Sequence, residues 1–305
     1  MSKLLDLGSP VTAAVDWLTV NLAGFFEVIA SVMLALVNAL LFVLTAPHPL
    51  VLVAAFAGIA WWASRRWGLP TYTALAFLVI LALDLWTPAM QSLAVVLVAS
   101  AIAVAIGVPL GVWAARSRRV SVAVRPVLDL MQTLPVFVYL IPTVFFFGIG
   151  VMPGIVATML FALPPAVRLT ELGIRQVDAE VVEAAEAFGT KPWQVLREVQ
   201  LPLALPSIMA GVNQVIMLSL SMVVIAGMVG ADGLGSVVVQ GISQLDVGAG
   251  FEGGVAVVLV AIFLDRTTNA LARPKRSRRR RKRPVAPEPA VPASESRPTA
   301  AAGTP

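Results

Sequence analysis

The sequence predicts an all-α membrane protein with about seven membrane-spanning helices and a helical N-terminal region. Of its 305 residues, 58% are hydrophobic and only 13% are charged, a balance far more apolar than that of soluble domains. Long apolar runs recur along the chain, several of them near the ~20 residues that a spanning helix needs. Tryptophans close some of these runs, as at Trp61, Trp62 and Trp86, which fits the aromatic belt at membrane interfaces.

The first 46 residues form a separate helical region in this prediction. Val11, Val15 and Leu18 recur on one helical face, and residues 25–46 are apolar enough to span a bilayer. Charged and polar residues interrupt the pattern, however, so we expect an amphipathic helix lying at the outer face of the membrane. A true span over 25–46 is the alternative.

Seven apolar runs follow this region. Two of them, residues 48–64 and 71–87, predict accessory spans within a segment 47–88. The other five predict the transmembrane core within residues 89–272, and they cover residues 90–115, 133–150, 152–167, 207–229 and 253–272.

The distribution of Lys and Arg predicts the orientation of these spans. The loops at 65–70, 116–125 and 168–205 carry basic residues, as does the C-terminal tail, whereas the loops at 88–89, 150–152 and 230–252 carry none. The positive-inside rule therefore predicts a multi-pass protein of the cytoplasmic membrane with its C-terminus in the cytoplasm. The N-terminus lies outside if 25–46 does not span, and inside if it does.

The longest of the basic loops contains a polar helical hairpin at residues 178–202. Asp178 is suited to cap a first helix, because its carboxylate accepts free N–H groups of the first turn. Gly189 is expected to end that helix in the left-handed conformation, which glycine adopts without a steric penalty. Thr190 is expected to cap a second helix, which Pro202 and Pro206 would end.

The hairpin resembles the signature loop of ABC importer permeases, which has the pattern Glu-Ala-Ala, three residues, Gly, nine residues, then an aliphatic residue, any residue, Leu and Pro. The matching residues are Glu183, Ala184, Ala185, Gly189, Val199, Leu201 and Pro202, with valine where isoleucine is commoner. The resemblance implies that the hairpin docks on a cytoplasmic ATPase and transmits its motion to the spans. An ordinary amphipathic cytoplasmic hairpin would show similar alanines and is the alternative interpretation.

Other segments are similar to the ProU/OpuA-type permeases for glycine betaine and proline, a subfamily of these importers. The matching segments are residues 131–142, 161–165, 168–170, 173–177, 209–214 and 264–266. The resemblance implies a type I ABC importer transmembrane domain that works as a permease homodimer, with two ATPase subunits and an extracytoplasmic substrate-binding protein. Asp232 departs from the pattern, which has a second glycine in that outer turn, and this leaves the details of docking open.

The residues themselves favour a transporter subunit over an enzyme. The phosphate-binding pattern G-x-x-x-x-G-K-[ST] is absent from the sequence, so ATP and Mg²⁺ are expected on the partner ATPase. The chain has no cysteine and a single histidine, His48, so we expect no metal or cofactor bound by this chain.

Five polar residues in the apolar segments are candidates for the translocation path. They are Gln132, Tyr139, Asn213, Gln214 and Ser221. Each would offer a transient polar contact to a quaternary amine, whereas the aromatic cage that selects such a ligand is expected on the binding protein. Hydrogen bonding between helices is the other interpretation for each of them.

We therefore expect an ATP-driven importer subunit for glycine betaine, proline betaine or a related compatible solute, with choline or carnitine as alternatives in the same family. A channel or an ion-coupled secondary transporter is the alternative from another class. Such proteins carry ionisable residues inside the membrane. Here the candidates are Glu27, Asp84 and Asp265, which lie near the ends of apolar runs.

The C-terminal segment 273–305 is basic and then rich in proline. Nine of the 22 Lys and Arg residues lie in 273–283, which leaves 13 basic residues against 17 acidic ones in the remainder. Directly after a span, this run predicts an anchor for topology and contact with anionic lipid rather than with nucleic acid. The residues beyond it are expected to be disordered.

Overall fold

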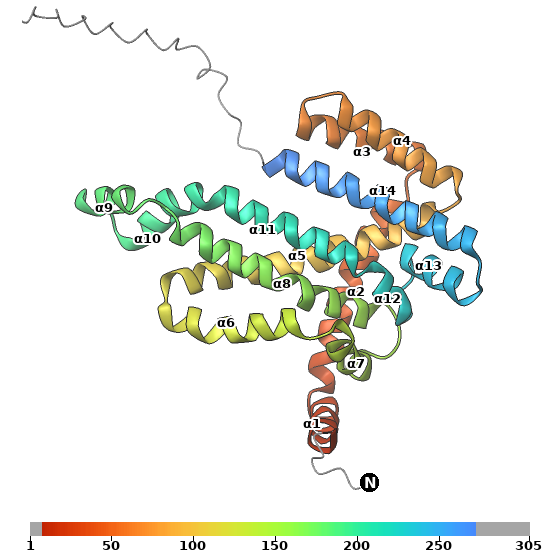
Figure 1. Cartoon of the computed structure of the whole chain (residues 1–305), viewed down its shortest axis with the longest axis horizontal. Coiled ribbons are helices and arrows are strands. Elements are labelled where there is room, and N and C mark those ends of the chain that lie inside the picture. The colour runs from red at the N-terminus through yellow and green to blue at the C-terminus, as the bar shows by residue number, and fades with distance from the viewer. Residues whose placement is uncertain (1–7, 273–305) are drawn as a thin grey trace, which may run out of the picture. The chain divides into compact units, whose positions relative to one another are not determined.

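The computed structural model describes residues 8–272, which form helices joined by short turns, with no strand in that range (Figure 1). The helices are α1 Gly8–Asn21, α2 Ala23–Thr45, α3 Pro49–Ser64, α4 Gly68–Ala82, α5 Trp86–Arg116, α6 Arg118–Thr133, α7 Val136–Phe147, α8 Val151–Arg175, α9 Ala179–Ala187, α10 Pro192–Gln194, the π-helix η1 Val195–Gln200, α11 Leu201–Ser221, α12 Val223–Met228, α13 Leu234–Ser243 and α14 Val247–Ala272. The prediction of an all-α protein is confirmed. The basic tail and its expected contact with lipid lie outside the described residues.

The helices α5, α8 and α11 lie side by side and pack closely (Figure 1). Glycines allow this approach: a Cβ atom added at Gly107 would lie 2.6 Å from Cβ of Ala166 on α8. One at Gly211 on α11 would lie 3.2 Å from Cβ of Leu169. Small residues at helix contacts are the usual basis of helix association in membranes, because they let backbones approach.

The number of membrane-spanning elements differs from the seven predicted. Five helical elements are long and apolar enough to cross a membrane, namely 23–45, 86–116, 151–175, 192–228 and 247–271. A sixth forms if α6 and α7, which are bent by 96° relative to each other, count as one. The break between them falls at Leu134, whose extended backbone is the conformation favoured before a proline.

The two predicted accessory spans are shorter than expected. The helix α3 has 16 residues and α4 has 15, below the ~20 that cross a bilayer without tilt or thinning. They form a hairpin that packs on α14, with the ring centroids of Phe56 and Phe77 4.7 Å apart and those of Phe77 and Phe263 5.1 Å apart. Trp61, in the last turn of α3, and Trp67, in the turn between the two helices, are exposed, which is typical of a membrane interface.

The helix α2 favours the alternative considered for residues 25–46, a true span. One face of α2 buries Met33 and Val37 against the neighbouring helices. Val32, Leu36 and Phe42 are exposed elsewhere around the helix, so α2 is apolar on most sides, whereas an amphipathic helix presents a polar face to water. An isolated Glu27 or Asn38 does not change this. With 23 residues, α2 has the length and composition of a span.

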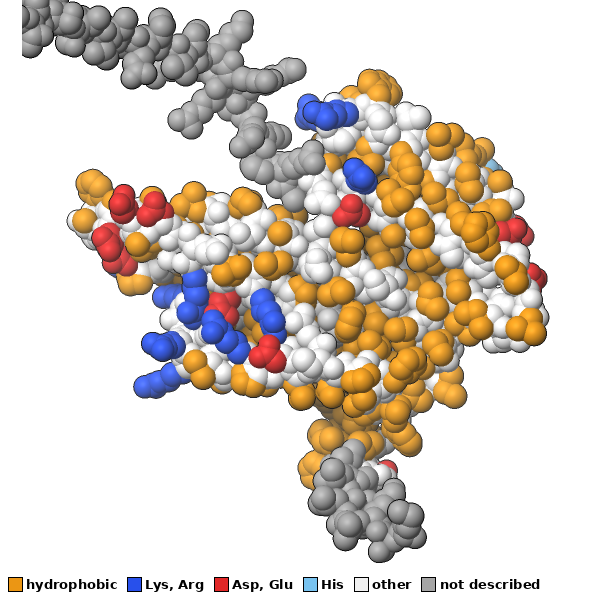
Figure 2. Space-filling model, viewed as in Figure 1, with side chains coloured by type: hydrophobic (Ala, Val, Ile, Leu, Met, Phe, Trp, Pro, Cys, Tyr) orange, Lys and Arg blue, Asp and Glu red, His pale blue; other side chains and the backbone are white. Residues whose placement is uncertain are grey.

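Charged side chains gather toward the ends of the helical bundle. Figure 2 shows Lys and Arg over α6 and the adjoining end of α8, acidic side chains on the projecting α9, and apolar side chains across the middle. The basic group includes the exposed residues Arg116, Arg118 and Arg119. An apolar middle between charged ends is the arrangement that a bilayer requires.

Candidate functional site

The first arm of the polar hairpin, α9, folds as its sequence predicts. Asp178 caps the helix, because its Oδ1 accepts a hydrogen bond of 3.1 Å from the Glu180 N–H. Gly189 ends it with a left-handed φ of +77°. The Gly189 N–H donates to Glu186 O at 2.8 Å and the next N–H, of Thr190, donates to Ala185 O at 3.3 Å. This pair of bonds is a Schellman motif, which satisfies carbonyls at the end of a helix.

The second arm corrects the prediction in two respects. The N-cap residue is Lys191 and not Thr190, and the Lys191 N–H donates to Gln194 Oε1 at 3.2 Å. Pro202 and Pro206 do not end the unit, since the chain continues as one helical element from 192 to 228. The π-helix η1 ends at Gln200, two residues before Pro202, and its wider turn accommodates a residue that lacks an N–H and would clash in a regular α-helix.

The hairpin is anchored on one side and exposed on the other. Leu196 is buried with Ile174 of α8 and Ile208 of α11, which fixes the base of the hairpin to two long helices. On the free side, Phe188 is 91% exposed and Trp193 is 57% exposed. Exposed aromatic side chains of this size mark a surface for a partner.

The residues predicted for ATPase coupling divide between these two sides. Glu183, Ala184, Gly189 and Pro202 are exposed, whereas Ala185, Val199 and Leu201 are half-buried. Phe188 was not among the residues predicted for the site. The signal that could have identified it is a large aromatic residue directly before the glycine that ends a polar helix.

The five residues predicted for the translocation path do not meet in one cavity of this chain. Gln132 on α6 and Gln214 on α11 are exposed. Ser221 is also exposed, and its hydroxyl donates to Met217 O at 3.1 Å within its own helix. A translocation path lined by these exposed side chains would therefore need a further surface, outside this chain, that faces them.

Tyr139 lines a different cavity, which is almost entirely apolar. The cavity has a volume of about 660 Å³ and lies between α2, α5, α7 and α8. Its wall includes Phe26 and Phe146, whose rings stack with centroids 4.6 Å apart. The Tyr139 hydroxyl is buried and has no hydrogen-bond partner among residues 8–272.

Asn213 joins two helices, which is the second of the two interpretations considered for it. Its amide donates to Asp265 Oδ1 at 3.2 Å, and its Oδ1 accepts from the Thr268 hydroxyl at 2.7 Å. Both partners lie on α14. Asn269 also donates to Asp265, at 2.8 Å. Asp265 is thus a structural acceptor between α11 and α14.

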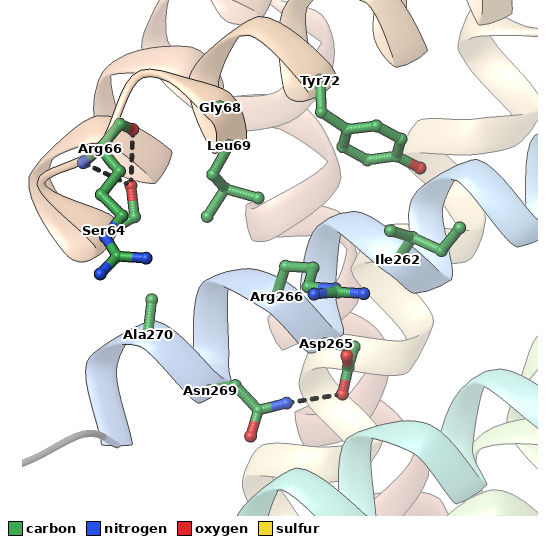
Figure 3. Close-up of a pocket in the computed structure, with 10 residues that line it drawn as sticks. All are labelled: Ser64, Arg66, Gly68, Leu69, Tyr72, Ile262, Asp265, Arg266, Asn269 and Ala270. Carbon is green, nitrogen blue, oxygen red and sulfur yellow. Dashed lines mark hydrogen bonds between the residues drawn. The ribbon is translucent and has the colours of Figure 1, made fainter.

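Asp265 also borders the largest of the described cavities, of about 740 Å³, at the ends of α3, α4 and α14 (Figure 3). Much of its polar lining is already bonded within the chain: the Tyr72 hydroxyl donates to Leu259 O at 3.3 Å, and the Ser64 hydroxyl donates to Arg66 O at 3.0 Å. Within the described residues, no group of three or more His, Cys, Asp or Glu is placed to hold a metal ion.

Comparisons with known proteins agree with this architecture. Residues 107–277 match the family of binding-protein-dependent transport system inner membrane components. The chain is 49% identical over 274 residues to the glycine betaine transport system permease protein OpuAB of Bacillus subtilis, covering 90% of this chain and 97% of that protein. It is 48% identical to the glycine betaine/carnitine transport permease protein GbuB of Listeria monocytogenes, covering 90% and 98% of the two chains.

A third relative is the glycine betaine/proline betaine transport system permease protein ProW of Escherichia coli, which is 47% identical over 92% of this chain and 78% of its own. Among solved structures, the inward-facing MetNI methionine ABC transporter superposes with a TM-score of 0.56 at 22% identity. That match covers 60% of this chain and 91% of the other. At this identity it shows the fold, which is that of a type I ABC importer transmembrane domain.

Proposed function

The chain belongs to the family of inner-membrane components of binding-protein-dependent transport systems, and from this we propose that it imports glycine betaine, proline betaine or a related quaternary-amine solute. The observation that carries the choice of substrate is the identity of 47–49% to three permeases named for glycine betaine, across at least 90% of this chain. The protein is a transporter subunit and not an enzyme.

Transport by this family involves an ATPase and a substrate-binding protein as separate partners. We propose two copies of the ATPase, which hold ATP and Mg²⁺, and two copies of the permease. The exposure of Gln132, Gln214 and Ser221 supports a permease homodimer, because side chains that do not meet within one chain would face a path completed by a second. An extracytoplasmic binding protein would deliver the solute to that path.

The test is reconstitution of the permease in liposomes with its ATPase and its binding protein. We expect uptake of labelled glycine betaine that requires ATP and is reduced by excess proline betaine. Stronger competition by choline or carnitine would show that one of these compounds, rather than a betaine, is the preferred substrate. Uptake that persists without the ATPase subunit would contradict an ATP-driven importer and favour a channel.

We propose that the hairpin α9–α10 binds the ATPase, with the most exposed aromatic side chain as its anchor. Phe188→Ala is expected to weaken assembly with the ATPase by about 2 kcal/mol, a typical loss for a buried interface anchor. The measurement is binding of the ATPase to the purified permease in detergent. Phe251→Ala, at a phenylalanine 71% exposed on α14, is the matched control and should bind normally. Equal binding by both variants would contradict the assignment.

The predicted orientation can be tested on a chain that has no native cysteine. Gln244→Cys and Glu186→Cys place thiols at exposed positions on loops of opposite predicted sidedness. The loop 230–252 has no Lys or Arg, so we expect Gln244→Cys to react with an impermeant thiol reagent in intact cells. Glu186→Cys should react only after permeabilisation. The reverse pattern would place the hairpin and the C-terminus outside.

A further inference from the structure

A buried carboxylate joins three helices directly before the polar hairpin. Glu171 lies in the last turns of α8 and is 6% exposed. Its Oε1 atom accepts a hydrogen bond of 2.7 Å from the Ser121 hydroxyl and one of 3.2 Å from Arg125, both on α6. Arg175, one turn further along α8, forms an ion pair with the same oxygen at an N–O distance of 3.1 Å.

Arg175 extends this cluster to α5. Another nitrogen of its guanidinium group donates to Ala114 O at 2.9 Å, in the last turn of α5. The cluster formed by Glu171, Ser121, Arg125 and Arg175 therefore connects α5, α6 and α8 at a single point. Only residues 176–178 separate its last member from α9.

The two contacts of α8 differ in kind. Against α5, α8 packs through glycines: a Cβ atom at Gly111 would lie 2.6 Å from the backbone oxygen of Val167, so these helices hold each other rigidly. Against α8, α6 makes a smaller apolar contact, formed by the buried Leu128 and the half-buried Val124 and Met131. The polar contacts around Glu171 add the directional part of this attachment, which is lost over small displacements.

The helix α6 leads directly to α7 through the 96° bend. Gln132 and Tyr139, two residues proposed for the path, lie on either side of that bend. A displacement of the hairpin is passed to α8 and α11, the two helices joined to it, and it reaches α6 and α7 only if α6 follows α8. We therefore propose that Glu171 is a positioning residue that makes α6 and α7 move with α8, so that ATP hydrolysis is coupled to opening of the path.

This proposal rests on the proposed importer function, and its first test uses the complete complex in liposomes. Glu171→Gln keeps the shape of the side chain but removes the charge that holds two guanidinium groups. We expect the number of ATP molecules hydrolysed per glycine betaine imported to rise about fivefold or more, the lower end of typical coupling between sites. Thermal unfolding of the complex checks that the variant is folded.

The chain offers a matched control between the same two helices. Arg168 of α8 pairs with Asp129 of α6, and both side chains are exposed, so this pair contributes little. Asp129→Asn should leave the ratio of ATP to solute unchanged. If Glu171→Gln does not assemble, Arg125→Gln removes a 60% exposed partner of the same carboxylate and replaces it in the test. An unchanged ratio in the assembled variant would overturn the proposal.

A second measurement does not depend on the transported solute. Spin labels at Val122 on α6 and Leu172 on α8 occupy exposed positions outside the cluster. In the permease–ATPase complex, we expect their distance to stay constant between nucleotide-free and ATP-bound states, and to change or broaden in Glu171→Gln. If the distance stays constant in both the unmodified permease and Glu171→Gln, the role of Glu171 is overturned even where uptake is intact. If the unmodified complex does not take up betaine, only the proposed substrate is contradicted.

Discussion

Replacement of Gly189 by valine is expected to abolish ATP-driven uptake while the protein still inserts into the membrane. Gly189 has a φ of +77°, and no atom lies within 4 Å of the position that a Cβ would take. The penalty is therefore in the backbone. A left-handed conformation costs an L-residue about 1–2 kcal/mol, and a β-branched residue is a marked outlier there. The hairpin would give up its Schellman turn, because this costs less than unfolding the long helices.

The measurements are glycine betaine uptake and stimulated ATP hydrolysis in proteoliposomes. Gly189→Asn is the matched control, since asparagine adopts the left-handed conformation more readily than other residues with a side chain. It should retain most of the activity. Normal uptake and ATP hydrolysis by Gly189→Val would show that the left-handed turn is not needed for coupling.

A single methyl group at Gly111 is expected to prevent the core from packing. A Cβ atom there would lie 2.6 Å from Val167 O and 2.7 Å from Cβ of Thr170. The first of these is a backbone atom, which cannot turn away as a side chain would. Overpacking of this kind typically costs about 1–3 kcal/mol. We expect Gly111→Ala to lower the unfolding temperature in detergent and the amount of protein in the membrane.

Gly58→Ala is the control, because Gly58 lies within α3 and has no atom within 4 Å of an added Cβ. Alanine is favoured over glycine inside helices by about 1 kcal/mol, so this variant should be as stable as the parent or more so. If both alanine variants unfold at the parent temperature, the contact between α5 and α8 is less close than the structure indicates.

The local features of the hairpin were predictable because they depend on neighbours in the sequence. Asp178 caps the helix that follows it, and Gly189 adopts the conformation for which glycine has no penalty. The membrane class followed from composition, and the family followed from the resemblance of the hairpin and of the segments after it. None of these inferences needed a contact between distant residues.

The predictions that failed depended on tertiary structure. Pro202 is a reliable helix breaker in isolation, but the π-helix before it lets the helix continue. The predicted basic loop 168–205 included Glu171, because the apolar run before it ends at residue 167. In the structure, partners on α6 and α8 compensate its charge, so α8 extends to Arg175.

The continuous element from Pro192 to Met228 has a mechanical consequence. Its closest contacts with α8 are at Ser207, whose Cβ would lie 2.6 Å from a Cβ at Gly173, and at Gly211. At a rise of ~1.5 Å per residue, these contacts stand about 25 Å from the hairpin end and about 25–30 Å from Met228. A rotation of the element about these contacts would move its two ends by similar distances in opposite directions, because the two arms are nearly equal in length.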